Sequence, residues 1–157
     1  MRSHPFFFLF AAVVFGCAPP AEEPIDREAD RAAIEGILRV ASASNQNRDV
    51  EAFLANLTED AIFMNPDGPA IEGKAAIREW ITQRFSEVDP QVTVSPVEIV
   101  VDHDVAFNRT HVTGFQVDLQ TGDTVVIDWK EIATLRRQPD GKWLVSRVIG
   151  NSNVPMN

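Results

Sequence analysis

The chain has 157 residues, enough for one domain with a core of its own, and 23 acidic against 14 basic residues give it a net charge of −9. This charge argues against nucleic acid and against an anionic lipid surface as partners. Cys17 is the only cysteine, so a disulfide within the chain and a cysteine-based metal site are both excluded.

The N-terminal segment has the pattern of a signal peptide. A short basic start precedes an apolar run over residues 6–15. A run of about ten residues matches a signal-peptide core and is too short to cross a bilayer as a helix. It leads into Val14-Phe15-Gly16-Cys17, which resembles a bacterial lipobox, where a small residue precedes the cysteine that is lipidated. The alternative for Cys17 is an ordinary residue of a soluble signal peptide.

The next segment, residues 18–24, is rich in proline and polar residues, as in a tether. We therefore expect a lipoprotein signal peptide over residues 1–16, a tether over 17–25 and one folded domain over 26–153. The predicted location is the bacterial cell envelope, with the chain anchored to the membrane by a lipid at Cys17, on the periplasmic or outer-membrane face.

Three helices and one short strand are predicted in the first half of the domain. Residues 26–45 carry apolar residues at helical spacing, with Asp26 as a candidate N-cap. A second, short helix is expected over 49–57 and a strand over 61–65. Gly73 precedes a third helix, for which the periodicity places the following residues inward: Ile77, Trp80, Ile81 and Phe85.

The second half changes to the two-residue period of strands. Strands are expected over residues 91–101, 105–119, 124–137 and 143–151. The Asp140-Gly141 pair marks a tight hairpin before the last of them. In the 105–119 strand the odd-numbered residues are predicted to form the apolar inward face: Phe107, Arg109, His111, Thr113, Phe115, Val117 and Leu119. Helices followed by antiparallel strands indicate an α+β domain.

Local motifs support a specific fold. Asn65-Pro66 ends the short strand, Gly73 to Trp80 opens the third helix, and Leu135 to Val145 forms the last hairpin. In this order they resemble the nuclear transport factor 2-like superfamily, which includes ketosteroid isomerases and SnoaL-like cyclases. The resemblance covers residues 26–153. It implies a cone-shaped (cystatin-like) fold, in which three N-terminal helices pack on a curved antiparallel sheet around a mostly apolar pocket.

The resemblance also implies where catalytic groups would lie. The base of the ketosteroid isomerases is an aspartate that falls on Asn65, and an amide cannot take up a proton near neutral pH. The tyrosine of those enzymes falls near Ala41, and this chain contains no tyrosine. Their neutral acid falls near Ala133. We therefore do not expect isomerisation by that mechanism.

Two other residues are candidates for proton transfer. Glu131 shares a strand face with Ala133, and burial facing the cone would raise its pKa. The alternative is a structural ion pair between Glu131 and Arg109 or Arg147. His111, on the predicted inward face, is a second candidate base because histidine titrates near neutral pH. The alternative is a core histidine whose ring nitrogens are paired with neighbours.

Five residues are candidates for ligand binding. Asn65 can donate and accept hydrogen bonds, and the indoles of Trp80 and Trp129 are apolar with one donor each. Phe85 adds an apolar surface, and core packing is the alternative for all three aromatic residues. Arg147 alternates with apolar residues on the last strand, which favours an inward guanidinium that attracts a carboxylate; the alternative is a surface arginine.

Three functions remain open from the sequence. The first is a membrane-tethered domain that binds a small hydrophobic or carbonyl-containing molecule. The second is a SnoaL-like isomerase, lyase or cyclase that uses Glu131 or His111 as its base. The third is a homodimeric assembly module that pairs through the exposed sheet face, for which we predict the residues Val112, Ile132, Thr134 and Val148. No cofactor is expected, and His103 and His111 are not spaced to share a metal ion.

Overall fold

The computed structural model describes residues 27–66 and 68–154, so the predicted signal peptide, the tether, Cys17 and the Asp26 cap lie outside the described residues. The described helices are α1 (Arg27–Gln46), α2 (Val50–Ala55) and α3 (Lys74–Glu87). None of them is long and apolar enough to cross a membrane.

The helices follow from their sequence patterns. In α1, Ile34, Ile37 and Leu38 recur at helical spacing and are buried, so this stripe faces the sheet. The short α2 begins after Asp49, whose carboxylate accepts a hydrogen bond from the Ala52 backbone N–H at 2.9 Å. The sequence predicted that this helix extends to residue 57, but α2 ends at Ala55 and Leu57 already belongs to a strand.

Six strands form one sheet in the order β2-β1-β6-β5-β4-β3. Neighbouring strands are antiparallel except β1 and β6, which are parallel. The two-residue β2 was not predicted from the sequence. The strand bounds are β1 (Leu57–Met64), β2 (Ile71–Glu72), β3 (Val88–Asp102), β4 (Val105–Asp118), β5 (Thr124–Arg137) and β6 (Trp143–Ser152).

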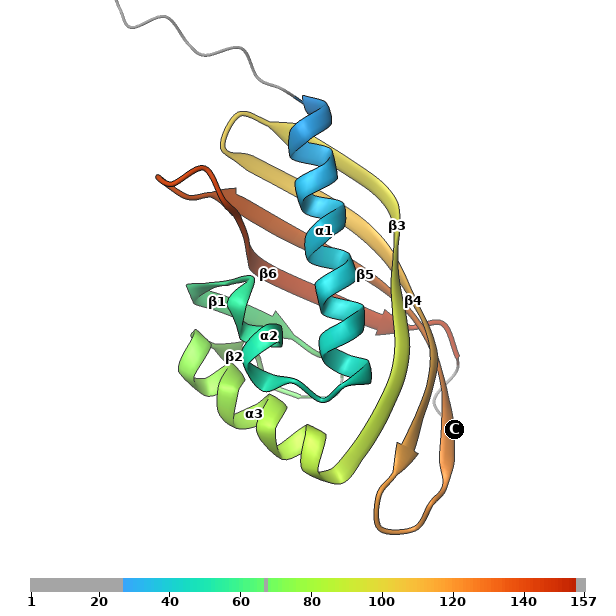
Figure 1. The fold of residues 1–157 in the computed structure, drawn as a ribbon. Helices are drawn as coiled ribbons and strands as arrows, with labels where there is room; N and C mark the ends of the chain where they lie inside the picture. The colour runs from blue at the N-terminus through green and yellow to red at the C-terminus, as the bar shows by residue number, and fades with distance from the viewer. Residues whose placement is uncertain (1–26, 67, 155–157) are drawn as a thin grey trace, which may run out of the picture.

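The sheet curves around α1, which lies across its concave side, while α2 and α3 cover the side where β1 and β2 lie (Figure 1). The main hydrophobic core joins Ile34 of α1, Leu54 of α2 and Ile77 of α3 to Leu135 and Val145 of the sheet. This arrangement confirms the predicted α+β class and the cone of helices on a curved sheet.

A buried carboxylate fastens the start of α1 to the sheet. Asp30 accepts hydrogen bonds from the Arg137 guanidinium at 2.5 Å and from the Trp143 indole N–H at 3.1 Å. The Arg137 guanidinium also lies 4.5 Å from the centroid of the Trp143 ring. These contacts, led by the hydrogen bond from Arg137, lower the pKa of Asp30. The carboxylate therefore stays ionised and holds one end of the helix in place.

Candidate functional site

A cavity of about 580 Å³ lies between the three helices and the concave face of the sheet. Its size falls within the range of small-molecule sites. Most of its wall is apolar, and the apolar lining includes Ile37, Leu38, Phe53, Phe63, Trp80, Ile81, Val92, Val94, Val112, Ile127, Trp129 and Val148.

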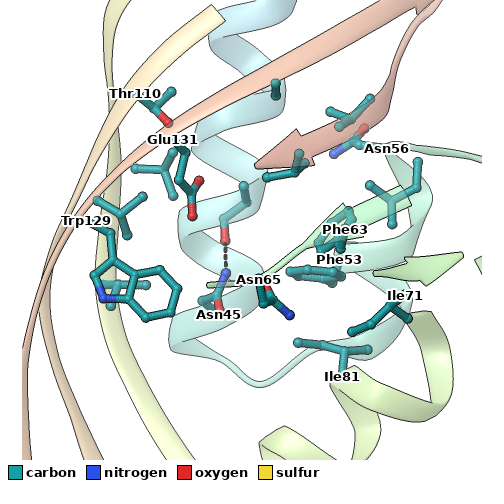
Figure 2. A pocket seen from close by; sticks show the side chains of 18 of the residues that line it. Asn45, Phe53, Asn56, Phe63, Asn65, Ile71, Ile81, Thr110, Trp129 and Glu131 are labelled. Atoms are coloured by element: carbon teal, nitrogen blue, oxygen red, sulfur yellow. Dashed lines mark hydrogen bonds between the residues drawn. The ribbon is translucent and has the colours of Figure 1, made fainter. Parts of the chain in front are cut away.

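Three aromatic side chains form one wall of this cavity. Phe53 of α2 lies 5.8 Å from Phe63 of β1 and 6.5 Å from Trp80 of α3, measured between ring centroids. Phe63 and Trp80 are 6.0 Å apart. Tilted and edge contacts of this kind hold the rings against one another. The three rings therefore form a stable apolar surface. Figure 2 shows Phe53 and Phe63 of this surface across the cavity from Trp129, which projects from β5.

A small polar floor lies on the sheet side of the cavity. It consists of Asn108 and Thr110 of β4 and Glu131 of β5, and Thr110 pairs directly with Glu131 in the sheet register. Asn108 is fully buried, and within the described residues neither its side-chain nitrogen nor its side-chain oxygen has a hydrogen-bond partner. A buried amide without partners is rare and costs free energy.

Glu131 is the ionisable group of this floor, and Figure 2 shows its carboxylate pointing into the cavity beside Thr110 and Trp129. Burial raises the pKa of Glu131 to about 7. Gly150 of β6 is its register partner on the other side, where an added Cβ would lie 3.0 Å from Glu131 Cγ. The glycine therefore leaves room for the Glu131 side chain beside the cavity.

The predicted ion pair of Glu131 is wrong, because both arginines are engaged elsewhere. Arg109 pairs with Glu98 at 3.5 Å and Arg147 with Asp60 at 3.6 Å. Among the residues that the structure describes, Glu131 has no ion pair or hydrogen bond with another side chain. Its charge is therefore unbalanced on the cavity wall.

The predicted inward orientation of His111 is also wrong. The prediction took the odd-numbered face of β4 as the inward one. In the structure the buried residues are even-numbered: Ala106, Asn108, Thr110 and Val112. His111 lies on the outer face with a side chain 47% exposed, and its Nε2 is 2.7 Å from Asp128 Oδ1. It does not line the cavity and cannot act as a base inside it.

The inward orientation of Arg147 fails for a different reason. The register of β5 and β6 shifts between Thr134 and Leu135, which leaves Ser146 as an extra residue on β6. The bulge places Val145 and Val148 on the cavity wall and turns Arg147 outward, where it donates a hydrogen bond to the Asp60 backbone oxygen at 3.0 Å. The surface alternative therefore holds.

The other predicted ligand contacts divide into two groups. Asn65, Trp80 and Trp129 line the cavity, as do Ala41 and Ala133 at the two other positions compared with the isomerases. Phe85 does not, because it is buried and packs edge-on against Phe53 at 6.2 Å. Ligand binding by the lining residues remains a prediction.

Sequence reasoning missed five polar residues of the cavity, which are Asn108, Thr110, Arg84, Asn45 and Asn56. Asn108 and Thr110 share the even-numbered face of β4, and choosing that face would have found them. Arg84 follows Trp80 by one helical turn on α3, so its place beside a predicted inward residue was the available signal.

The described residues contain no group of three histidine, cysteine, aspartate or glutamate side chains placed to hold a metal ion.

Comparisons with known proteins agree with this architecture. A model of the SnoaL-like domain matches residues 27–145. A ketosteroid isomerase-like protein from Erwinia carotovora atroseptica is 26% identical with a TM-score of 0.76, over 83% of this chain and 100% of that one. An NTF2-like protein with a cystatin-like fold from Novosphingobium aromaticivorans is 21% identical with a TM-score of 0.65, over 82% of this chain and 85% of that one.

A more distant structure of the same fold is a hexachlorocyclohexane dehydrochlorinase from Novosphingobium barchaimii. It is 17% identical with a TM-score of 0.69, over 82% of this chain and 90% of that one. No curated protein matches the sequence.

Proposed function

This chain belongs to the SnoaL-like domain family, and we propose that its conical cavity binds a small hydrophobic molecule that carries a carbonyl or hydroxyl group. One observation carries the proposal: within the described residues, the side chains of Asn108 and Glu131 on the floor of a mostly apolar cavity have no protein partners. Asn108 and Glu131 cost stability in the empty cavity, and a ligand that offers hydrogen bonds to them would offset that cost.

The cavity is tested with N-phenyl-1-naphthylamine, a neutral apolar probe whose fluorescence rises in apolar surroundings. We expect saturable binding to the full chain. The substitution Ala133→Phe places a ring in the cavity, because Ala133 lines it, and should weaken binding at least about tenfold, equivalent to about 1.4 kcal/mol. Fluorescence titration measures both dissociation constants.

Two variants control this experiment. Ala75→Phe makes the same change at an exposed position of α3 outside the cavity and should leave binding unchanged. Val148→Phe fills the cavity from β6 and serves if Ala133→Phe does not fold. Absence of saturable binding, or equal binding by both cavity-filled variants and the unmodified chain, contradicts the proposal.

An enzymatic function is the second candidate, favoured by the pKa of about 7 for Glu131. A general base is most effective when its pKa lies near the working pH. As an isomerase, lyase or cyclase, the protein would use Glu131 to take a proton from carbon next to a carbonyl group. For any substrate recovered from the purified protein, Glu131→Gln should abolish turnover while His111→Ala leaves it intact. Equal turnover by the Glu131→Gln variant would exclude this base.

Membrane attachment is proposed from the sequence alone, through a lipid on Cys17. Expressed in a bacterial host, the full chain should partition into a detergent phase and the Cys17→Ser variant into the aqueous phase. Equal partitioning of the two proteins would contradict lipidation and leave the signal-peptide alternative.

Pairing of two chains through the outer sheet face is a further proposal. The predicted patch was half wrong, because Val112 and Val148 face the cavity. Ile132 and Thr134 are exposed, and their register partners Ile149 and Phe107 are exposed as well; Phe107, Ile132 and Ile149 are between 38% and 46% exposed. Light scattering should give a dimer for the full chain and a monomer for Ile132→Glu; a monomer for both contradicts pairing.

A further inference from the structure

Arg84 is a cation on the wall of an apolar cavity. It projects from the last turn of α3 and lines the cavity together with Trp80 and Ile81 of the same helix. Its Nη2 donates a hydrogen bond to the side-chain oxygen of Gln116 on β4 at 2.8 Å. Burial lowers the pKa of Arg84, which means that the surrounding protein disfavours its charge.

No carboxylate of the described residues balances this charge at close range. Within residues 27–66 and 68–154, no aspartate or glutamate oxygen lies within 4.0 Å of the Arg84 guanidinium, whereas Arg109 and Arg137 each have such a partner. Glu87 raises the pKa of Arg84 only through charge attraction at longer range, and its carboxylate accepts a hydrogen bond from Gln83. Arg27 and Arg39 also form no ion pair with any described residue, but both are exposed, so water can solvate their charges.

A guanidinium has five N–H donors, and the neutral Gln116 oxygen takes one of them. The remaining donors can hold a carboxylate or sulfonate with two parallel hydrogen bonds. Arg84 contacts Gln116, which lies six residues from Thr110 along β4, so the polar floor lies well away from the guanidinium. An ionised Glu131 on that floor repels an anion. A ligand with one anionic group would therefore orient that group toward Arg84 and its uncharged part toward Asn108 and Glu131.

We propose that Arg84 is an anion-binding subsite of the cavity, so that the preferred ligand is an amphipathic acid with a carboxylate or sulfonate on an apolar body. This inference rests on the proposed ligand-binding function. It narrows the ligand class from any small hydrophobic molecule to one whose charge pairs with Arg84 while its apolar part contacts Trp80 and Trp129.

A matched pair of probes tests the subsite. 1-Anilinonaphthalene-8-sulfonate has the aromatic body of N-phenyl-1-naphthylamine with an added sulfonate. With the full chain, we expect Arg84→Gln to weaken binding of the sulfonate about tenfold and to change binding of the neutral probe less than about twofold. Arg84→Lys, which keeps the charge but not the planar fork, should give an intermediate loss.

Arg39→Gln is the matched control, because it removes the same charge from an exposed position of α1 outside the cavity. It should leave the binding of both probes unchanged. Circular dichroism checks that each variant folds. If Arg84→Gln does not fold, the comparison of Arg84→Lys with the unmodified chain still decides the test.

The outcomes separate the two proposals. Absence of binding by the neutral probe contradicts the ligand-binding function itself. If the neutral probe binds and neither Arg84 variant weakens sulfonate binding, the subsite is excluded while the ligand-binding function stands. If Arg39→Gln weakens sulfonate binding as much as Arg84→Gln does, the effect comes from the overall charge of the protein, and the subsite is also excluded.

Discussion

Replacing Glu131 with glutamine is expected to stabilise the folded protein above neutral pH, by roughly 2–3 kcal/mol in the free energy of unfolding. Most substitutions of buried residues destabilise. Here the wild-type side chain is the unfavourable one, because its carboxylate is removed from water without a compensating ion pair in the described structure. A neutral amide of the same shape avoids the cost of burying the charge.

The direction of the pH dependence follows from the raised pKa. Burial moves the pKa of Glu131 from 4.5 in its ordinary state to about 7 in the folded state. Between these two values the folded chain binds more protons than the unfolded chain, so wild-type stability falls as pH rises. Below about pH 4.5 the carboxyl is protonated in both states, and this contribution disappears.

Chemical denaturation at pH 4.5, 6 and 8 measures the difference between wild type and Glu131→Gln. The stability gap should widen with pH and level off above neutrality. Glu79→Gln, at an exposed position on α3, is the control and should change stability by no more than about 0.5 kcal/mol at any of these pH values. A gap for Glu131→Gln that stays constant from pH 4.5 to 8 would show that the carboxyl is not desolvated.

This prediction links stability to function. A side chain that weakens the fold at neutral pH is usually retained because the site uses it. Glu131 faces the same cavity as the unpartnered amide of Asn108. The buried carboxyl of Glu131 and the unpartnered amide of Asn108 both reduce the stability of the fold. Their location in one cavity favours a binding site over a packing defect.

Much of the architecture was predictable because it depends on local patterns. The bounds of α3 and β5 agree with the periodicity, and Gly141 closes the last hairpin with a positive φ of 83°. The sequence placed Glu131 on the same face of β5 as Ala133 but left open whether that face points into the cavity; the structure adds that Ile127, Ala133 and Leu135 on this face are buried.

The errors arose where local patterns were ambiguous. On β4 the odd-numbered face carries Phe107 and Phe115, so it is more apolar than the cavity face, which carries Asn108 and Thr110. Alternation alone then selects the wrong face, because a binding cavity places polar residues inside. The Ser146 bulge changes the alternation of β6 midway, and no glycine or proline marks it in the sequence.

The substitution Gly114→Ala is expected to cost about 3 kcal/mol or more in the free energy of unfolding. Gly114 lies within β4 with φ +145°, a conformation that other residues rarely adopt. An added Cβ would lie 2.1 Å from the Gln91 carbonyl oxygen and 2.9 Å from Val92 Cα, both on the adjacent β3. Both are backbone atoms, so no side-chain rotation can relieve the contact.

Gly122→Ala separates the free-energy cost of the steric clash from that of the backbone conformation. Gly122 also has a positive φ, of 77°, but an added Cβ there would have no neighbour within 4 Å. It should cost only about 1–2 kcal/mol, the penalty of the left-handed conformation. Denaturant unfolding of the two variants gives the difference, and equal losses would contradict a close approach of β3 to β4.

The cavity should also respond to Gly114→Ala. Gly114 pairs with Val92 on β3, and Val92 and Val112 line the cavity on either side of this close approach. Relieving the clash requires β3 and β4 to separate, which would displace both valines. Any folded fraction of Gly114→Ala should therefore bind N-phenyl-1-naphthylamine more weakly than Gly122→Ala does. Unchanged binding would mean that this part of the sheet does not shape the site.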